Sequence, residues 1–406
     1  AKIVIGKDTR RSSYMFEYSL VAGLTASGAD AYLLHVTTTP SVSYVARTED
    51  FDCGIMISAS HNPFYDNGIK LINAAGEKMK EDVIAEIEKY LDGEFGEIPY
   101  ATRENIGCTV DYTAGRNRYM GYLMSLAIYS FKGIRVGLDA SNGSAWTLAK
   151  AVFDALGAKT YVINAAPDGT NINANCGSTH IEGLQDLVRR EHLDVGFAFD
   201  GDADRCLAVD EHGNILTGDH IIYMYAKYMK SKGTLKDNTV VATVMSNLGF
   251  FKALEAEGID CVVTDVGDKN VYAAMVKDDY RLGGEQSGHI ILSKFATTGD
   301  GLITAIKLME VIIASKKSVG TLASGMKEYP QILINVKVAD KNAAMENEEV
   351  LAEVKKTEEL LAGDGRVLVR KSGTEPLVRV MVEAKDNVTC REMAEHLAEF
   401  IKNKCN

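Results

Sequence analysis

The chain has 406 residues, of which 46% are hydrophobic and 25% charged, and its formal net charge is -12 at pH 7. This length exceeds the roughly 250 to 300 residues at which one hydrophobic core stops growing, so we expect several domains. The acidic balance argues against nucleic acid or an anionic membrane as partner, and an anionic substrate would need a local basic pocket. No apolar run approaches the ~20 residues of a membrane helix and no signal peptide opens the chain, which predicts a cytoplasmic protein.

Short apolar runs alternate with amphipathic stretches through the first three quarters of the chain. The alternation predicts three successive units of strands and helices. The expected strands are 2–5, 31–36, 53–57, 134–139, 159–163, 195–199, 240–243 and 260–264. The expected helices are 14–27, 42–49, 146–156, 181–191, 248–257, 270–276 and 301–315. Strands and helices that alternate at this spacing form largely parallel sheets.

The pattern changes after residue 329. Strands are expected at 332–338, 366–369 and 377–383, with separate helices at 348–361 and 390–402. We therefore predict three related α/β domains with mixed, largely parallel sheets, and a smaller C-terminal α+β domain. The predicted boundaries are 1–114, 115–215, 216–327 and 328–406.

A serine-containing loop, Ser-Ala-Ser-His-Asn-Pro at residues 58–63, follows the predicted strand 53–57. Ligands of parallel α/β sheets bind beyond the carboxyl ends of the strands, so Ser60 could present its hydroxyl there with His61 beside it. The next strand begins after an Asp-Asn-Gly turn and carries Lys70, a cation suited to phosphate or proton transfer. A serine-rich turn without chemistry is the alternative.

Arg10 lies just past the first predicted strand, in Gly-Lys-Asp-Thr-Arg. A guanidinium there could pair with two oxygens of a phosphate. The alternative is a solvated surface loop.

Three aspartates, Asp200, Asp202 and Asp204, leave the end of another predicted strand at alternate positions. Ligands of one Mg²⁺ must approach to about 3 Å of one another, so this segment must bend, and Gly201 permits it. Without a cation the three carboxylates would repel by several kcal/mol at an effective dielectric of about 20. A calcium loop of the EF-hand type fits less well, because Arg205 stands where that loop needs glycine and the flanks read as strands.

Two further loops combine glycines with polar side chains. Residues 283–289, Gly-Gly-Glu-Gln-Ser-Gly-His, could approach a polyhydroxylated ligand or form only a tight turn, and they lack the spacing of a dinucleotide fingerprint. Residues 370–376, Arg-Lys-Ser-Gly-Thr-Glu-Pro, look like a phosphate nest without the Walker A pattern. The candidate ligand-binding residues are Glu285, Ser287 and His289 in the first loop, and Arg370, Ser372, Gly373, Thr374 and, beyond the second loop, Arg379.

Five segments together resemble the α-D-phosphohexomutase family, and the resemblance spans essentially all 406 residues. They are SASHNP, DNGIK, DGDADR, GGEQSGH and RKSGTEP, in the family's order. The resemblance implies four domains around a central cleft, a phosphoserine at Ser60, and Mg²⁺ held by Asp200, Asp202, Asp204 and that phosphate. It implies a sugar-binding loop at 283–289, a phosphate site at 370–374, and a further ligand-contacting cation at Lys269.

Three smaller sequence features are similar to the branch of the family that acts on glucosamine phosphates: Ser58, Gln286 and the stretch 171–180. That branch converts glucosamine 6-phosphate to the 1-phosphate through a 1,6-bisphosphate, which also serves as activator, and supplies UDP-N-acetylglucosamine and cell-wall synthesis. Lys70 and His289 are then candidates for general acid and base.

Alternatives are the phosphomannomutase and phosphoglucomutase branch, a serine-dependent metal phosphatase and a non-catalytic sugar-phosphate sensor. A homodimer is compatible with the resemblance. Lys371 replaces an expected proline, and the family's opening segment is not found before Ala1, which led us to expect an incomplete first domain.

Overall fold

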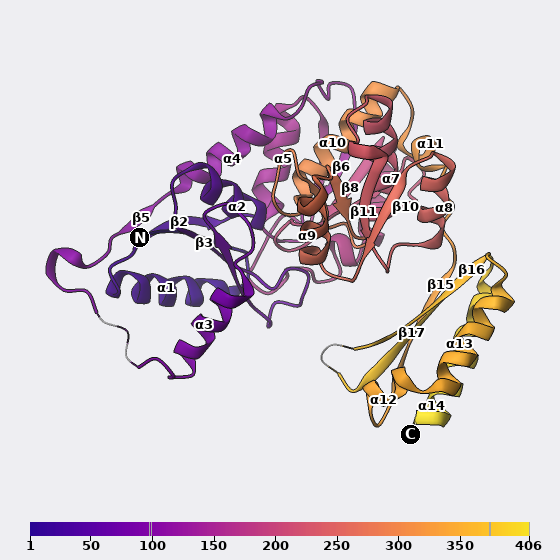
Figure 1. Cartoon of the computed structure of the whole chain (residues 1–406). Helices are drawn as coiled ribbons and strands as arrows, with labels where there is room; N and C mark the ends of the chain where they lie inside the picture. Colours follow the sequence, from indigo (N-terminus) through magenta and orange to yellow (C-terminus); the bar gives the residue numbers. More distant parts are fainter. Residues whose placement is uncertain (97, 99, 373–374, 406) are drawn as a thin grey trace. The chain divides into compact units, whose positions relative to one another are not determined.

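The computed structural model describes all residues except 97, 99, 373, 374 and 406. The chain divides into two compact units, Ala1–Met245 with Gly258–Ser324, and Ser246–Glu257 with Gly325–Asn406. The first unit contains three mixed sheets and the second a three-stranded one (Figure 1).

The three sheets of the first unit repeat one arrangement. The first sheet has the order β4-β3-β1-β2-β5, the second β10-β9-β8-β6-β7, and the third β12-β11-β13-β14. In each sheet one central strand, β1, β6 or β11, pairs in parallel with a neighbour on either side. One of the two neighbours, β3, β8 or β13, also pairs in antiparallel fashion with the next strand of the chain. The strands are β1 (Lys2–Lys7), β2 (Asp30–Val36), β3 (Cys53–Ile57), β4 (Ile69–Asn73), β5 (Thr109–Asp111), β6 (Arg135–Asp139), β7 (Lys159–Ile163), β8 (Val195–Phe199), β9 (Cys206–Val209), β10 (Ile215–Leu216), β11 (Thr239–Thr243), β12 (Asp260–Thr264), β13 (Leu282–Gly284) and β14 (Ile290–Leu292).

Helices connect the parallel strands. Those that precede or flank the first two sheets are α1 (Arg11–Ala26), α2 (Thr39–Thr48), α3 (Glu81–Leu91), α4 (Thr113–Ser125), α5 (Ala145–Ala155) and α6 (Glu182–Glu191). Those around the third sheet are α7 (Gly218–Ser231), α8 (Leu248–Ala256), α9 (Asp268–Asp278), α10 (Gly301–Ser315) and α11 (Val319–Ala323), of which α8 is grouped with the second unit.

The central strands of the first sheet, β1 and β3, are largely apolar because helices cover both of its faces. On one face Val4 and Met56 pack with Val42 and Val45 of α2. On the other face Ile5 and its neighbours pack against the inner side of α1. A buried parallel strand needs apolar side chains in both directions, which is why these segments read as continuous apolar runs.

The second unit is an antiparallel sheet with the order β15-β17-β16. Alternate valines of β17, Val378, Val380 and Val382, belong to one core with residues of the two long helices. Its elements are β15 (Gln331–Lys337), α12 (Lys341–Glu346), α13 (Glu348–Leu361), β16 (Gly365–Lys371), β17 (Leu377–Ala384) and α14 (Asn387–Cys405).

The predicted fold class is confirmed by these three mixed, mostly parallel sheets and the antiparallel C-terminal one. The sequence pattern missed the helices α3, α4 and α7, the short helices α11 and α12, the short strands β5 and β10, and the hairpin of β13 and β14. Helix α4 carries two glycines and an asparagine and has almost no apolar stripe, so its periodicity gives no signal. Among the described residues, no helix is long and hydrophobic enough to cross a bilayer.

Candidate active site

The three predicted loops of the first unit occupy the same topological position in their sheets. Each joins a parallel strand to the antiparallel strand beside it: β3 to β4, β8 to β9, and β13 to β14. They carry Ser60, the three aspartates and the 285–289 segment, respectively. The repeated fold therefore brings one chemically distinct loop from each sheet to an equivalent strand end.

Ser60 lies in the loop that leaves β3 and adopts a positive φ of 50°. Its Oγ donates a hydrogen bond to Oδ2 of Asp200 at 2.5 Å, and its backbone N–H donates to Oγ of Ser58 at 3.0 Å. Nδ1 of His61 lies 3.4 Å from the same Oγ. The serine hydroxyl thus points at the acidic loop of a different sheet, as the hypothesis of a shared magnesium requires.

Arg10 fixes the backbone of the serine loop through hydrogen bonds. Its guanidinium is fully buried and donates to the carbonyl oxygens of Ser60 and Asn62, at 2.9 Å each, and of Pro63. Its Nε donates to Oδ2 of Asp8 at 2.7 Å. The role of Arg10 as a direct phosphate partner stays a prediction, and in this structure its guanidinium donates to backbone carbonyls of the serine loop and to Asp8.

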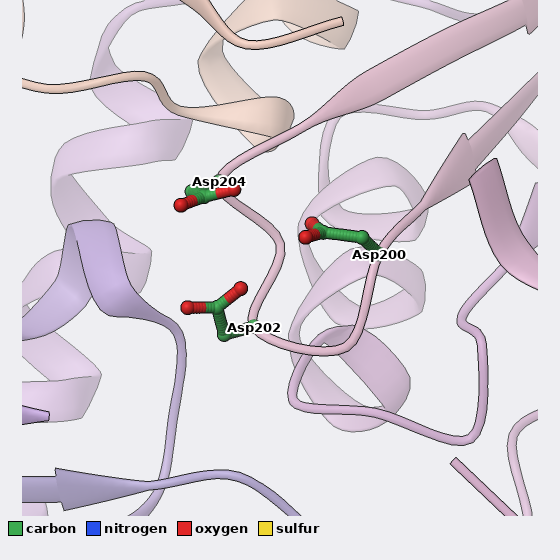
Figure 2. A group of neighbouring side chains, drawn as sticks. All are labelled: Asp200, Asp202 and Asp204. Carbon is green, nitrogen blue, oxygen red and sulfur yellow. The ribbon is translucent and has the colours of Figure 1, made fainter. Parts of the chain in front are cut away.

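The three aspartates lie on one bent segment after β8, and Figure 2 shows their carboxylates turned toward a common space. One oxygen from each lies within 4.8 Å of the others. Ala203 has a φ of 56°, which accounts for the bend. Gly201 is needed for a different reason, since a Cβ there would lie 2.5 Å from the carbonyl oxygen of Ser60.

These carboxylates fit a divalent cation. All three are buried, and Oδ1 of both Asp202 and Asp204 has no hydrogen-bond partner. Burial, together with the neighbouring carboxylates of Asp204 and Asp202, raises the pKa of Asp200 to about 8. Oxygen ligands of this kind are those that Mg²⁺ prefers, and a cation would satisfy both orphaned oxygens.

Lys70 of β4 partly neutralises the cluster. Its Nζ lies 2.5 Å from Oδ2 of Asp202 and 3.3 Å from Oδ2 of Asp204. Burial lowers the pKa of Lys70, but these carboxylates more than offset that effect and the net shift is upward. The hydroxyl of Thr39 donates to the same Oδ2 of Asp202.

His289 is buried beside the cluster, in the loop after β13. Its Nδ1 lies 3.6 Å from Oδ1 of Asp204, and its Nε2 lies 3.5 Å from Oδ2 of Asp268 and accepts a hydrogen bond from the backbone of Gly299. Burial lowers the pKa of His289, whereas Asp204 and Asp268 raise it, and the net shift is upward.

Of the other predicted ligand residues of the first unit, Arg205 contacts the aspartate cluster directly. Glu285 accepts the backbone N–H of Gly267 at 3.0 Å, and Ser287 is exposed. Arg205 donates its backbone N–H to Oδ1 of Asp200 at 3.1 Å, and burial lowers its pKa while Asp200 raises it, with a net increase. Lys269 pairs at 2.8 Å with Glu81 of α3.

The second unit carries the predicted phosphate residues. Arg370 and Arg379 stand directly opposite each other on β16 and β17, and neither Nε has a hydrogen-bond partner. Ser372 is buried and accepts the backbone N–H of Glu375 at 3.3 Å. Two like charges at one cross-strand position repel, so an anion would relieve the pair. Gly373 and Thr374 lie outside the described residues.

Four residues that hold this site were missed from the sequence: Asp8, Thr39, Asn173 and Asp268. Nδ2 of Asn173 donates to the carbonyl oxygens of Ser60 and Asn62, at 2.8 and 3.1 Å. Thr39 and Asn173 contact loops of a different sheet, Asp202 and Ser60 respectively, and no local spacing in the sequence links them to these partners.

The fold and site agree with four family descriptions in chain order. Residues 1–96, 117–213 and 217–329 match Phosphoglucomutase/phosphomannomutase alpha/beta/alpha domains I, II and III, and residues 333–400 match the C-terminal domain. The chain belongs to the phosphoglucomutase/phosphomannomutase, or phosphohexomutase, family.

Within that family the chain groups with the phosphoglucosamine mutases. It is 76% identical to the phosphoglucosamine mutase of Lachnospira eligens, over 100% of this chain and 90% of the relative. Identity to that of Lachnoclostridium phytofermentans is 60%, with the same coverage.

Two solved structures share the fold at low identity. A phosphoglucomutase/phosphomannomutase family protein from Burkholderia thailandensis superposes with a TM-score of 0.81 at 22% identity, covering 100% of this chain and 90% of that one. An Aspergillus fumigatus N-acetylphosphoglucosamine mutase, solved in complex with GlcNAc-6P and magnesium, gives 0.73 at 18% identity, covering 96% and 94%.

Proposed function

We propose that this chain interconverts glucosamine 6-phosphate and glucosamine 1-phosphate, with Ser60 carrying the transferred phosphoryl group. The observation that supports it most is the 2.5 Å hydrogen bond from Oγ of Ser60 to Asp200, within a buried trio of carboxylates. A hydroxyl in that position can share a cation with the trio when phosphorylated. The identity to phosphoglucosamine mutases supports the choice of glucosamine.

The proposed reaction has two transfers of one phosphoryl group each. The bond between phosphorus and Oγ of Ser60 breaks as phosphorus bonds O1 of glucosamine 6-phosphate. O1 loses its proton to a base and Oγ takes one from an acid. The 1,6-bisphosphate then reorients and returns its 6-phosphoryl group to Oγ by the reverse steps, leaving glucosamine 1-phosphate. Added bisphosphate acts as activator because it phosphorylates Ser60.

Each site residue has a role in this scheme. Asp200, Asp202 and Asp204 would hold Mg²⁺ together with the phosphate of Ser60, and the bound ion supplies positive charge to the transferring group. Lys70 and His289 are the candidates for proton transfer, and His61 flanks the serine. Substrate contacts are assigned to Lys269, Glu285, Ser287, Arg370, Ser372, Gly373, Thr374 and Arg379, and Arg205 supports the metal loop.

The proposal is tested by following glucosamine, glucose and mannose phosphates by ³¹P NMR with Mg²⁺ and the matching bisphosphate. We expect glucosamine phosphates to turn over fastest with almost no release of inorganic phosphate. We expect mass spectrometry to find a phosphate on the wild-type chain, and Ser60→Ala should lose both this phosphate and turnover, whereas Ser19→Ala, at an exposed position of α1, should lose neither. Preference for mannose phosphate, net phosphate release, or binding without conversion would each replace the proposal with one of the alternatives.

Two further expectations stay predictions. The homodimer would be tested by light scattering of the purified chain, and the cytoplasmic location by fractionation of the source cells.

A further inference from the structure

The first unit contains a cavity that lies apart from the acidic cluster. It has a volume of about 750 Å³ and is bordered by the end of α4, by α7, by the end of β14 and by α10. None of the predicted site residues lines it. Strand β14 runs between the two places, since it begins just after His289 and ends at Leu292, which lines the cavity. Small-molecule sites typically have volumes of roughly 300 to 1,000 Å³.

The cavity has aromatic walls. Tyr225 and Tyr228 lie side by side on α7 with ring centroids 6.1 Å apart, and Phe295 and Tyr129 complete the lining. Tyr225 is buried, whereas 37% of Tyr129 is exposed, so the aromatic surface extends from the interior to the opening. Aromatic rings in such a cavity offer stacking faces to a planar ring.

A buried ion pair forms the polar floor. Nζ of Lys307 donates to Oε2 of Glu310 at 2.9 Å and to the carbonyl oxygen of Leu126 at 3.0 Å. The hydroxyl of Tyr228 donates to Oε1 of Glu310 at 3.2 Å. The only carboxylate that lines the cavity, within the described part of the chain, is therefore already neutralised by Lys307.

Three further cations surround the opening: Lys232, Lys294 and Arg281. Nζ of Lys232 lies 5.4 Å from the ring centroid of Tyr228, and Nζ of Lys294 lies 5.6 Å from that of Phe295. Arg281 pairs with exposed Asp279, but neither lysine has a carboxylate within 4.0 Å among the residues described. In a chain of net charge -12, an aromatic cavity with two unpaired ammonium groups is a local reversal of charge.

We propose that this cavity binds a nucleotide, specifically a nucleoside diphosphate, with the base between the aromatic side chains and the phosphates at Lys232 and Lys294. The aromatic walls account for the ring and the two ammonium groups account for the anionic tail. Neither feature alone selects this class, because a simple anion needs no aromatic wall and a neutral ring needs no cations. The proposal does not depend on the reaction at Ser60.

The test is isothermal titration of the full chain with ADP and with UDP in EDTA, which prevents metal-bridged binding at the aspartates. Saturating glucosamine 6-phosphate is included to occupy the other site. We expect one nucleotide per chain, with adenosine, uridine and pyrophosphate each binding at least tenfold more weakly. The double variant Lys232→Ala/Lys294→Ala should bind at least tenfold more weakly, with an unchanged melting temperature.

A matched control is Lys132→Ala/Lys402→Ala, which removes two exposed lysines that do not line this cavity. It should bind with wild-type affinity. The proposal would be overturned if neither nucleotide bound or if glucosamine 6-phosphate competed with the nucleotide. It would also be overturned if the cavity variant kept its affinity or if pyrophosphate bound equally well.

Discussion

Gly201 and the carbonyl oxygen of Ser60 lie too close for any side chain between them. A Cβ at residue 201 would lie 2.5 Å from that oxygen and 2.9 Å from Nδ2 of Asn173, which also holds the serine loop. We expect Gly201→Ala to displace the loop and lower mutase turnover by about 100-fold, since misplacement by about 1 Å can have this effect. Steady-state kinetics measures it.

Gly121→Ala is the control for that variant, because a Cβ there meets nothing within 4 Å. It lies inside α4, where alanine should raise the free energy of unfolding by about 0.4 to 1 kcal/mol. Normal turnover in Gly201→Ala would contradict the assigned role of the close contact.

Arg10 is the second residue whose role follows from contacts. Arg10→Met would leave Asp8 buried without its charge partner, and we expect a loss of about 3–5 kcal/mol in the free energy of unfolding by urea denaturation. Exposed Arg11→Met should change it by less than about 0.5 kcal/mol.

The loss in Arg10→Met should also depend on pH. Burial raises the pKa of Asp8 and Arg10 lowers it, so removing Arg10 raises it further. A carboxyl group whose pKa is raised on folding contributes stability when protonated and loses it as pH rises. The destabilisation should therefore be smaller at pH 5 than at pH 8, and an equal loss at both would argue against a buried Asp8 charge.

At the scale of the element, the β8–β9 loop concentrates three carboxylates that only a cation relieves. Because the pKa of Asp200 is raised to about 8, the metal-free protein should lose stability as pH rises from about 5 to 8. Asp200→Asn should remove part of this slope and raise the melting temperature in EDTA at pH 8.

Magnesium should reverse the order of the two melting temperatures, so that the wild type becomes more stable than Asp200→Asn. It should raise the melting temperature of the wild type more than that of Asp200→Asn, because binding to the folded state stabilises it. Differential scanning calorimetry with and without Mg²⁺ measures both effects. A variant less stable than the wild type in EDTA would contradict the predicted repulsion.

The elements also differ in how far they could be predicted. Strands β3, β7, β8 and β12 and helices α10 and α13 have the predicted bounds, because their apolar runs are long or strongly periodic. The hairpin of β13 and β14 was missed because each strand has three residues and the first includes two glycines. Its pairing depends on the sheet, not on local preference.

At the scale of the whole molecule, an acidic chain must bind a doubly anionic substrate. Arg370 and Arg379 are the facing cations of the second unit. We expect Arg379→Met to lower kcat/KM for glucosamine 6-phosphate by about 10- to 100-fold, since a hydrogen bond to a charged group contributes about 1.5–3 kcal/mol. Initial-rate kinetics checks this.

The control is Arg391→Met, which removes an exposed arginine from α14 of the same unit. It should leave kcat/KM within about twofold, because an exposed ion pair contributes less than about 1 kcal/mol and does not contact substrate. Equal losses in the two variants would indicate a general charge effect instead of a phosphate site.

By itself the sequence determined the class of fold and the kinds of side chain at the strand ends, because apolar periodicity and turn residues are local properties of the chain. Only the tertiary structure decided which of these side chains meet. Ser60 and Asp200 are 140 residues apart, and Asn173 reaches Ser60 across 113 residues. Such contacts depend on how separate sheets pack, and no local spacing encodes them. The same reason applies to Arg10, because its position past a strand end predicted a ligand contact but gave no sign of its hydrogen bonds to the serine loop, whose acceptors lie 50 and 52 positions away in the sequence.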